Sequence, residues 1–431
     1  MLNFHKFISF YKFILDTNSL LIYYLVMETP ILNPYRPGAG HAPPYLAGRE
    51  QEIENFAKLL DQRIIIKNCI VTGLRGVGKT VLLDEFKTVA IREEWLWTGN
   101  EISESVALTE GRLCTRIMAD LSMVTSGLSI KKIKEEAIGF TPNETGTDIF
   151  LNHKNIEFLF QDAPGLESDK LKYILEYAWQ QIKQNMPQIK GLIFAYDEAQ
   201  SLSDYEKNKT YALTMLLDVF QSIQRKGIPF MLLLCGLPTL QAKLIESRTY
   251  SERMFTVLLL HKLSDKDSRL AITKPIEQEN CPIRFNEISI NLIIKTSGGY
   301  PYFIQFICKE TFDVFLQQHS ISKELGVPID SIMLKLDDEF FAGRWAIITD
   351  RQRELLWVIA HLENCEEEFT VQEIVSESKK YQITAFGGSQ VNQMLSSLTA
   401  NGLIFKNRFG KYSFAVPQLN EFILRQNTNR Q

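Results

Sequence analysis

The stretch Cys69–Thr80, CIVTGLRGVGKT, passes from a short apolar run into a glycine-rich loop and then into residues with helical spacing. Its last eight residues fit G-x-x-x-x-G-K-[ST], in which backbone N–H groups and a helix N-terminus surround a phosphate, and the lysine reaches the β- and γ-phosphate oxygens. The alternative is a glycine turn that binds no nucleotide. The buried strand predicted at Cys69–Val71 and the helical spacing of Val81–Val89 favour a phosphate-binding loop. The predicted nucleotide-contacting residues are Gly73, Leu74, Arg75, Gly76, Val77, Gly78, Lys79 and Thr80.

Two acidic residues follow the apolar run Leu192–Tyr196 in a second motif, GLIFAYDEAQ. Such a run is typical of a parallel strand buried on both faces, and ligands of parallel sheets bind at the carboxyl ends of the strands. Asp197 therefore suits the Mg²⁺ shell together with the Thr80 hydroxyl, and Glu198 suits the activation of an attacking water. The alternative is that the two acids only begin a helix. On this reasoning Glu198 and Lys79 are the catalytic candidates.

Length and composition are those of a globular protein with two or three domains. The chain has 431 residues, of which 45% are hydrophobic and 23% charged, with a net charge of −4. This balance excludes a global attraction to nucleic acid or anionic membrane, so any basic patch must be local. The cysteines stand in apolar contexts without C-x-x-C spacing, which indicates reduced core residues of a cytoplasmic protein. They are Cys69, Cys114, Cys235, Cys281, Cys308 and Cys365.

The first 26 residues differ from the rest of the chain. They are rich in Phe, Tyr, Ile and Leu, but Lys12 and Asp16 interrupt them, so we expect no stable membrane insertion. Leu20–Met27 has the character of a short signal core, yet no small-residue cleavage site follows it. Our preferred interpretation is that Met27 is the true start. An amphipathic anchor is the main alternative.

Strand and helix patterns alternate along the rest of the first half. Further buried strands are predicted at Trp95–Trp97 and Pro229–Cys235, and residues 128–165 are predicted to be an irregular surface insertion. From Leu263 to His319 the pattern is wholly helical, which implies a separate subdomain. Helices are expected at Gly48–Leu60, Ser105–Val124, Leu171–Ile182, Tyr211–Ile223, Asp265–Glu277, Ile288–Thr296 and Tyr302–Phe315.

The C-terminal part has the ingredients of a winged helix, namely three helices followed by a two-stranded ribbon about Gly410. The helices are expected at Asp350–Leu362, Thr370–Lys380 and Ser389–Leu398, and the strands at Leu403–Phe409 and Tyr412–Val416.

The segments GREQEIENF, GLRGVGKT, FAYDEAQ, CGLPTL, SERMF and SGGYPYFIQ occur in this order. In this respect the chain resembles AAA+ ATPases of the replication-initiator and origin-recognition clade and their bacterial relatives, over about residues 44–431. The resemblance implies an N-terminal extension (1–34), a P-loop α/β domain with a parallel sheet flanked by helices (35–262), a helical lid (263–345) and a winged helix (346–431). It also implies ATP and Mg²⁺ as ligands and an ATP-driven switch that works as a homo-oligomer or with a partner ATPase.

The same resemblance suggests roles for three further residues. Arg49 corresponds to a segment beside the adenine, and Pro301 to the start of a lid helix that faces the nucleotide. Arg253 stands where such proteins place an arginine that reaches a neighbour's γ-phosphate. The alternative for Arg253 is an ordinary surface salt bridge.

Two departures from the family pattern favour slow hydrolysis. Cys235-Gly236 replaces the polar residue expected after the fourth strand, and Gly299-Tyr300-Pro301 replaces the arginine expected in the lid. Gly299-Tyr300-Pro301 is similar to the G-x-P of signal-transduction ATPases, and Gly236-Leu237-Pro238 to helper ATPases of transposition and secretion systems.

Two clients of the switch remain open. The candidate recognition helix Ser389–Asn401 has no lysine or arginine, and the positive charges lie in the wing, at Lys406, Arg408 and Lys411. Duplex DNA in replication, transposition or mobile-element biology is the leading hypothesis. A regulatory role in which the winged helix binds protein partners is the other.

Overall fold

The computed structural model describes residues 32–428 apart from a few short segments. These are Ala39, Arg63, Glu104, 106–108, 131–148, 206–208, Asn280, Pro282, 318–323, Gln382 and Phe409. The expectations for residues 1–26 and for Met27 as a start lie outside the described residues. In the described part of the chain, no helix is both long and apolar enough to cross a membrane.

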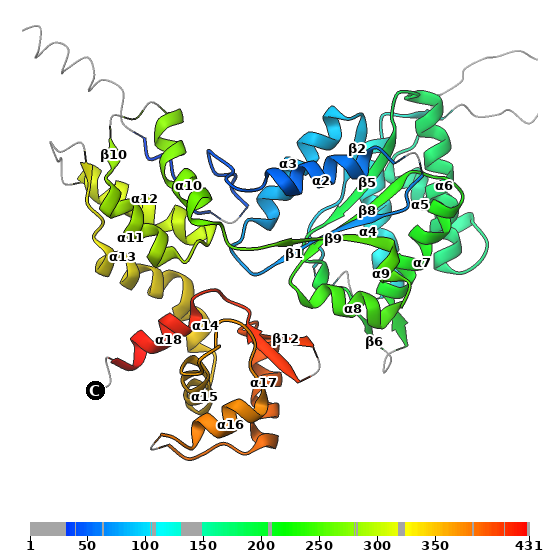
Figure 1. Ribbon diagram of the computed structural model, residues 1–431. Helices are drawn as coiled ribbons and strands as arrows, with labels where there is room; N and C mark the ends of the chain where they lie inside the picture. Colours follow the sequence, from blue (N-terminus) through cyan, green and yellow to red (C-terminus); the bar gives the residue numbers. More distant parts are fainter. Residues whose placement is uncertain are drawn as a thin grey trace, which may run out of the picture.

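A five-stranded parallel sheet forms the centre of the first half of the molecule (Figure 1). The strand order is β2-β5-β8-β1-β9, so β1, which leads into the glycine loop, is paired on both sides. Every residue of β1, β5 and β8 is buried, as the apolar runs predicted. The edge strand β9 was not predicted. The strands are β1 (Asn68–Gly73), β2 (Trp95–Thr98), β5 (Gly191–Tyr196), β8 (Phe230–Gly236) and β9 (Phe255–Leu260).

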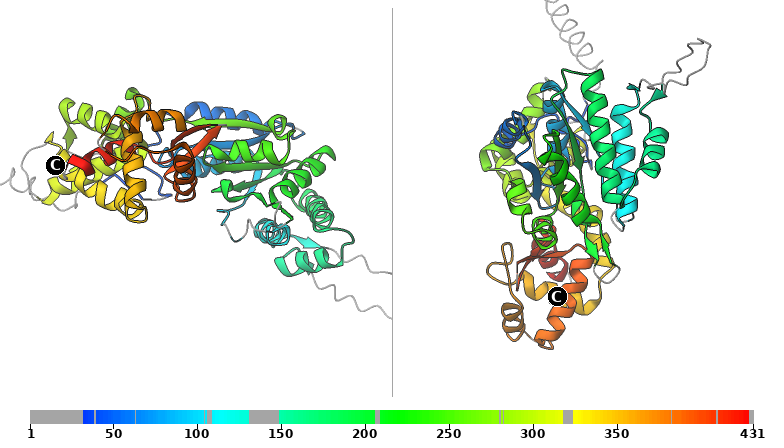
Figure 2. Two further views of the ribbon diagram at one scale, coloured as in Figure 1. Left: turned by 90° about the horizontal axis from the view of Figure 1, so that it is seen from below. Right: turned by 90° about the vertical axis from the view of Figure 1, so that its right-hand side faces the viewer.

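Helices cover both faces of the sheet, because alternate strand residues point to opposite sides. On one face Phe56 stacks on Phe86 at 4.1 Å and packs with Ile193, whereas Phe194 points into the core on the other face. Figure 2 shows the two helical layers with the sheet between them. The first layer contains α2 (Glu50–Leu60) and α3 (Lys79–Arg92), and the second α4 (Glu110–Thr125), α6 (Glu167–Asn185) and α7 (Ala212–Arg225). The parallel α/β fold predicted from the sequence is confirmed.

The prediction of an irregular insertion over residues 128–165 is wrong for its second half. Residues 153–162 form the helix α5 (His153–Asp162), whose Ile156 and Phe160 join the core beside α4 and α6. The Asn152 side chain accepts a hydrogen bond from the Asn155 N–H at 3.1 Å and caps this helix. The sequence prediction extended the irregular character of the preceding residues over this segment, although Ile156, Leu159 and Phe160 have helical spacing. A two-residue ribbon precedes the helix, and short strands also precede α7: β3 (Ser129–Ile130), β4 (Ile149–Phe150), β6 (Asp204–Tyr205) and β7 (Thr210–Tyr211).

The residues after β9, here called the lid, are mainly helical, as predicted. The lid ends in a π-helical turn, η3 (Asp337–Phe341), and a short helix, α14 (Ala342–Ala346). Neither of these two elements was predicted from the sequence. The lid elements are α10 (Asp265–Gln278), β10 (Arg284–Phe285), α11 (Glu287–Ser297), α12 (Pro301–Gln317), β11 (Glu324–Leu325) and α13 (Ile329–Leu336).

Residues 346–428, here called the C-terminal region, contain three helices and an antiparallel ribbon in the order predicted for a winged helix. Capping boxes at Thr349 with Gln352 and at Thr370 with Glu373 fix the starts of the first two helices. A further helix follows the ribbon. The elements are α15 (Asp350–Ala360), α16 (Val371–Ser378), α17 (Gly388–Ala400), β12 (Ile404–Arg408), β13 (Lys411–Phe414) and α18 (Leu419–Thr428).

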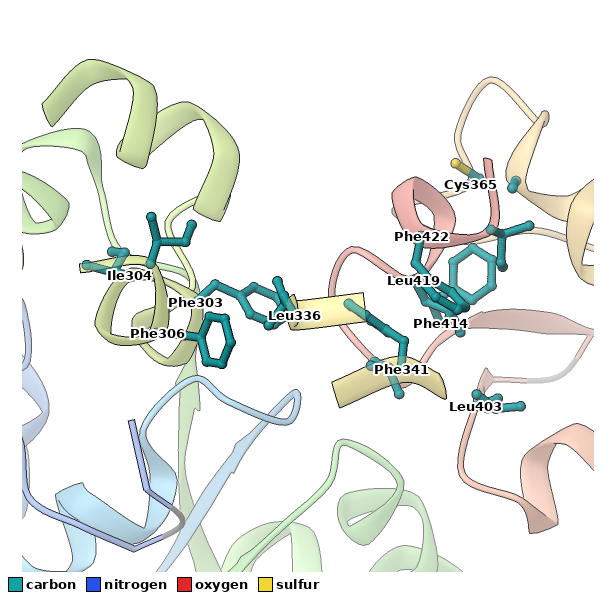
Figure 3. Close-up of a cluster of buried hydrophobic side chains, with 14 of the residues drawn as sticks. Phe303, Ile304, Phe306, Leu336, Phe341, Cys365, Leu403, Phe414, Leu419 and Phe422 are labelled. Atoms are coloured by element: carbon teal, nitrogen blue, oxygen red, sulfur yellow. The ribbon is translucent and has the colours of Figure 1, made fainter. Parts of the chain in front are cut away.

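The lid and the C-terminal region share one hydrophobic core. Phe341 stacks on Phe422 at 4.8 Å, and Figure 3 shows this pair within a cluster that extends from Phe303 of the lid to Leu403 (Figure 3). Close to it, Arg425 binds the nearly buried Asp337 through two hydrogen bonds, at 2.9 and 2.6 Å. The buried core is therefore continuous across the boundary between the lid and the C-terminal region.

The C-terminal region also touches the nucleotide domain. Its strand β12 lies beside α8 (Thr239–Ser247), the helix that follows β8. A Cβ added to Gly402 would lie 3.7 Å from Nη2 of Arg75 in the glycine loop. The short helix α9 (Ser251–Met254) then leads into β9. All six cysteines are buried and free, as predicted.

Candidate nucleotide site

The loop between β1 and α3 has the backbone of a phosphate-binding loop. Gly76 and Gly78 have φ angles of 76° and 93°, in the left-handed region that favours glycine. A Cβ on Gly73 would lie 2.7 Å from the Leu260 carbonyl oxygen, so only glycine fits beside β9. Because Gly78 is the N-cap of α3, the positive end of that helix opens directly at the loop.

Lys79 is held close over this loop. Its Nζ donates hydrogen bonds to the carbonyl oxygens of Gly73 at 3.0 Å and Leu74 at 2.9 Å. Burial lowers the pKa of the amine, and the carboxylates of Asp197 and Glu198 partly oppose this effect. A bound polyphosphate would add further negative charge and favour the charged ammonium.

The two predicted metal ligands lie together. The Thr80 hydroxyl donates a hydrogen bond to Oδ2 of Asp197 at 2.8 Å, although 117 residues separate them in sequence. The other carboxylate oxygen of Asp197 accepts the Glu198 N–H at 2.8 Å, which orients the side chain. Neighbouring hydroxyl and carboxylate oxygens are the hard ligands that Mg²⁺ takes in addition to substrate phosphates, so the residues present fit this ion.

Glu198 lies at the end of β5 in a conformation that few non-glycine residues adopt. Its φ is 51°, and it lines the same cavity as the glycine loop. Strained backbone of this kind persists where the surrounding structure holds it in place. One of its carboxylate oxygens accepts a hydrogen bond from the side-chain amide of Gln200.

A cavity of about 300 Å³ opens beside these residues. The glycine loop lines it, and so do residues of the segments 36–38 and 40–47, which precede α2. The lid contributes α10, α12 and two residues near its end, Phe340 and Arg344. The lid is also bonded to the loop directly, since the Tyr302 N–H donates to the Gly76 carbonyl oxygen at 3.2 Å.

The charges around the cavity suit a polyanion. Its cationic side chains outnumber the single carboxylate, that of Glu198. The Nε of Arg75 is buried and has no hydrogen-bond partner among the residues that the structure describes, so it is an unsatisfied donor of the kind that an anionic ligand can complete. Burial, and then repulsion from Arg75, lowers the pKa of Arg344. The cationic lining residues are Arg36, Arg49, Arg75, Lys79 and Arg344.

Three residues assigned by resemblance occupy different kinds of position. Arg49 lines the cavity, but its buried guanidinium donates to the carbonyl oxygens of Val77 at 2.9 Å and His261 at 2.8 Å, so it supports the loop. Pro301 begins α12 at the cavity wall. Arg253 is exposed on α9, does not line the cavity and has no ion-pair partner among the described residues.

Sequence reasoning missed Arg344 and Gln200. Arg344 stands 43 positions after Pro301, in a segment without a recognisable motif, and Gln200 follows the acidic pair without any marked pattern. The sequence offered one indirect indication. The lid and the end of β8 lack the polar residues expected there, so other side chains had to take their place. Tertiary structure brings other side chains to both places.

Comparisons with known proteins agree with this architecture. The Walker-type ATPase PABY2304 of Pyrococcus abyssi matches with a TM-score of 0.55 and 15% identity, over 88% of this chain and 96% of that one. The ORC2 protein of Aeropyrum pernix in its ADP form matches with a TM-score of 0.54 and 14% identity, over 91% and 97%. The protein has the AAA+ ATPase fold.

The sequence comparisons add one match. A family described as a domain of unknown function, DUF8462, covers residues 338–423, from the π-helical turn η3 to α18. No curated protein matches the sequence. The structural likeness therefore shows the AAA+ fold. The sequence identities are too low to carry over an activity or a partner, which must be argued from the residues of this chain.

Proposed function

We propose that this protein is a slow ATPase that acts as a nucleotide-dependent switch in the cytoplasm. The observation that carries the proposal is the meeting of Lys79, the Thr80–Asp197 pair and Glu198 around one cation-rich cavity. These are the parts that phosphoryl transfer to water requires, namely phosphate binding, a metal shell and a base. The free, buried cysteines support a reducing compartment.

The chemistry follows from the positions of these side chains. Lys79 and Arg75 bind the phosphate oxygens, and α3 contributes its N-terminal potential. Mg²⁺, held by Thr80 and Asp197, would neutralise charge on the β- and γ-phosphates. Glu198 accepts a proton from water as the water oxygen bonds to the γ-phosphorus, and ADP leaves as the bond to the bridging oxygen breaks.

We propose ATP rather than another nucleoside triphosphate. The cavity wall away from the loop is apolar and is formed by Pro43, Tyr45, Leu46, Ala47 and Leu263. Such a wall suits a stacked purine base. The Aeropyrum neighbour with the same fold is an ADP form, which supports adenine.

For the client, the charge distribution favours a protein partner over DNA. Residues 346–431 contain nine lysines and arginines and nine acidic residues, so they carry no net attraction for phosphates. The exposed face of α17 presents Gln390, Asn392 and Gln393 without any cation. Duplex DNA is the second candidate, because the exposed Lys406 and the half-buried Lys411 lie on the wing.

The test is ATP binding and turnover by the full chain. Lys79→Ala should weaken ATP binding by at least about tenfold, because charge-assisted hydrogen bonds to the phosphates are lost. Lys87→Ala, an exposed lysine on the same helix, is the matched control and should bind as the wild type does. Glu198→Gln should retain ATP and slow hydrolysis by about 10²-fold or more. Wild-type affinity in Lys79→Ala would refute the site.

A further inference from the structure

The Gln200 side chain bridges the ends of two strands. It lies in η1 (Ala199–Ser201), directly after the acidic pair that follows β5. Its amide Nε2 donates to the Glu198 carboxylate, and its Oε1 accepts the Leu237 N–H at 3.0 Å, just beyond β8. The proposed base is thus tied through one amide to the backbone that leads into α8.

This bridge fits closely into its surroundings. Gly236 has no Cβ, and one placed there would lie 2.5 Å from Oε1 of Gln200. From α8, Lys243 donates to the Gln200 carbonyl oxygen and to the Ser203 hydroxyl, the latter at 2.8 Å. Burial lowers the pKa of Lys243, which is a sign of a desolvated contact. Gln200 is therefore fixed at both its backbone and its side chain.

We propose that Gln200 is a positioning residue that restrains the Glu198 carboxylate and keeps ATP turnover slow. The proposal rests on the proposed function, in which Glu198 accepts a proton from water. The amide binds Oε2 of the carboxylate and so limits the rotation by which either carboxylate oxygen could face a water on the γ-phosphate. The restraint adds no reactant to hydrolysis; it changes how often the base is available.

The restraint is also connected to the C-terminal region. Lys243, which holds the Gln200 carbonyl, belongs to α8, and α8 lies beside strand β12 of the C-terminal region. A movement of the C-terminal region against α8 reaches Glu198 through Lys243 and Gln200. In Figure 1, β12 and α8 lie next to one another between the sheet and the C-terminal helices.

The decisive measurement is steady-state ATP hydrolysis by Gln200→Ala in the full chain. We expect kcat to rise about two- to tenfold, the scale of one hydrogen bond, while KM and ATP affinity remain at wild-type values. The matched control is Gln241→Ala, an exposed glutamine on α8 that should leave kcat unchanged. A kcat that is unchanged or lower in Gln200→Ala overturns the proposal.

A second variant guards against an effect of misfolding. Gly236→Ala places a methyl group against the end of the Gln200 side chain and leaves Glu198 untouched, so it should raise kcat in the same direction. In the Glu198→Gln background, Gln200→Ala should have no effect, because the two residues act through one contact. If wild-type protein binds no ATP, the proposed function fails; if Lys79→Ala and Glu198→Gln behave as expected and Gln200→Ala does not, only the restraint fails.

Discussion

Arg344 adds a positive charge to the cavity, and this charge comes from the lid. It stands on α14, at the end of the lid. Its guanidinium lies 5.1 Å from the Phe340 ring and donates to the Phe340 carbonyl oxygen at 2.8 Å. Within the described residues it has no acidic partner, and Arg75 is the charged group that lowers its pKa after burial. Two arginines that repel one another across a cavity favour an anion between them.

Arg344→Ala should weaken binding of ATP by about tenfold, and binding of ADP by less, because an arginine contact with phosphate is worth about 1.5–3 kcal/mol. Titration of both nucleotides into the purified protein measures this ratio. Arg353→Ala is the matched control, because Arg353 also stacks on an aromatic ring, Trp345, but does not line the cavity. Equal losses for the two nucleotides would mean that Arg344 does not distinguish the terminal phosphate.

At the scale of elements, the ribbon of β12 and β13, here called the wing, bears on whether the partner is duplex DNA or a protein. The acidic run Glu366–Glu368 precedes Phe369, which exchanges two backbone hydrogen bonds with Tyr412 of β13, at 2.8 and 2.9 Å. The Glu368 carboxylate accepts a hydrogen bond from Asn407 on β12 at 3.2 Å. Negative charge thus lies on the ribbon itself, at the Glu368 carboxylate, and weakens the attraction of this element for a phosphate backbone.

If the wing binds duplex DNA, the affinity should fall with salt with a log–log slope of about −3 at most, since each phosphate contact contributes about −0.9. Replacing Lys406, Arg408 and Lys411 by Ala should remove this binding and spare basal ATP turnover. Fluorescence anisotropy at low ionic strength with ATP present tests both points. Wild-type protein without salt-sensitive binding would leave the protein partner as the client.

At the scale of the whole molecule, the edge of the sheet has the features of a subunit interface. Strand β9 is an edge strand and exposes Val257 and Leu259, and Ile64 and Ile66 are exposed just before its partner β1. Arg253 lies exposed immediately before β9. Within the described part of the chain, β9 has no strand on its outer side and Arg253 has no ion-pair partner. An edge with apolar side chains and such an arginine suits contact with a second copy of the chain or a partner ATPase.

Arg253→Ala should leave ATP affinity unchanged and lower turnover only at protein concentrations where subunits associate. The expected loss is about 10²-fold or more, because an arginine supplied to a neighbour's γ-phosphate stabilises charge in the transition state. Turnover measured across a dilution series gives the result, with Arg225→Ala, an exposed arginine at the end of α7, as control. Turnover independent of both concentration and Arg253 would indicate a monomeric switch.

The sequence by itself determined the glycine loop and the residues that meet at the carboxyl ends of the buried strands. The glycine loop is one uninterrupted segment, so its residue spacing dictates its backbone, and the Thr80–Asp197 contact followed from the rule that parallel strands end at one edge. The long amphipathic helices and buried strands were equally readable. Helix α5 and edge strand β9 were missed. The irregular segment before α5 was extended over the helical spacing of Ile156, Leu159 and Phe160, and a six-residue apolar run such as Phe255–Leu260 is compatible with a strand and with a buried helix segment alike.

Only the tertiary structure decided which side chains that are distant in sequence reach the site. Arg344 enters the cavity because the π-helical turn and the shared core with Phe422 set the path of α14, and neither leaves a local signature in the sequence. Gln200 meets Leu237 because β5 and β8 are neighbours in the sheet. Contacts of this kind depend on packing between elements distant in the chain, and a periodicity within one element carries no information about them.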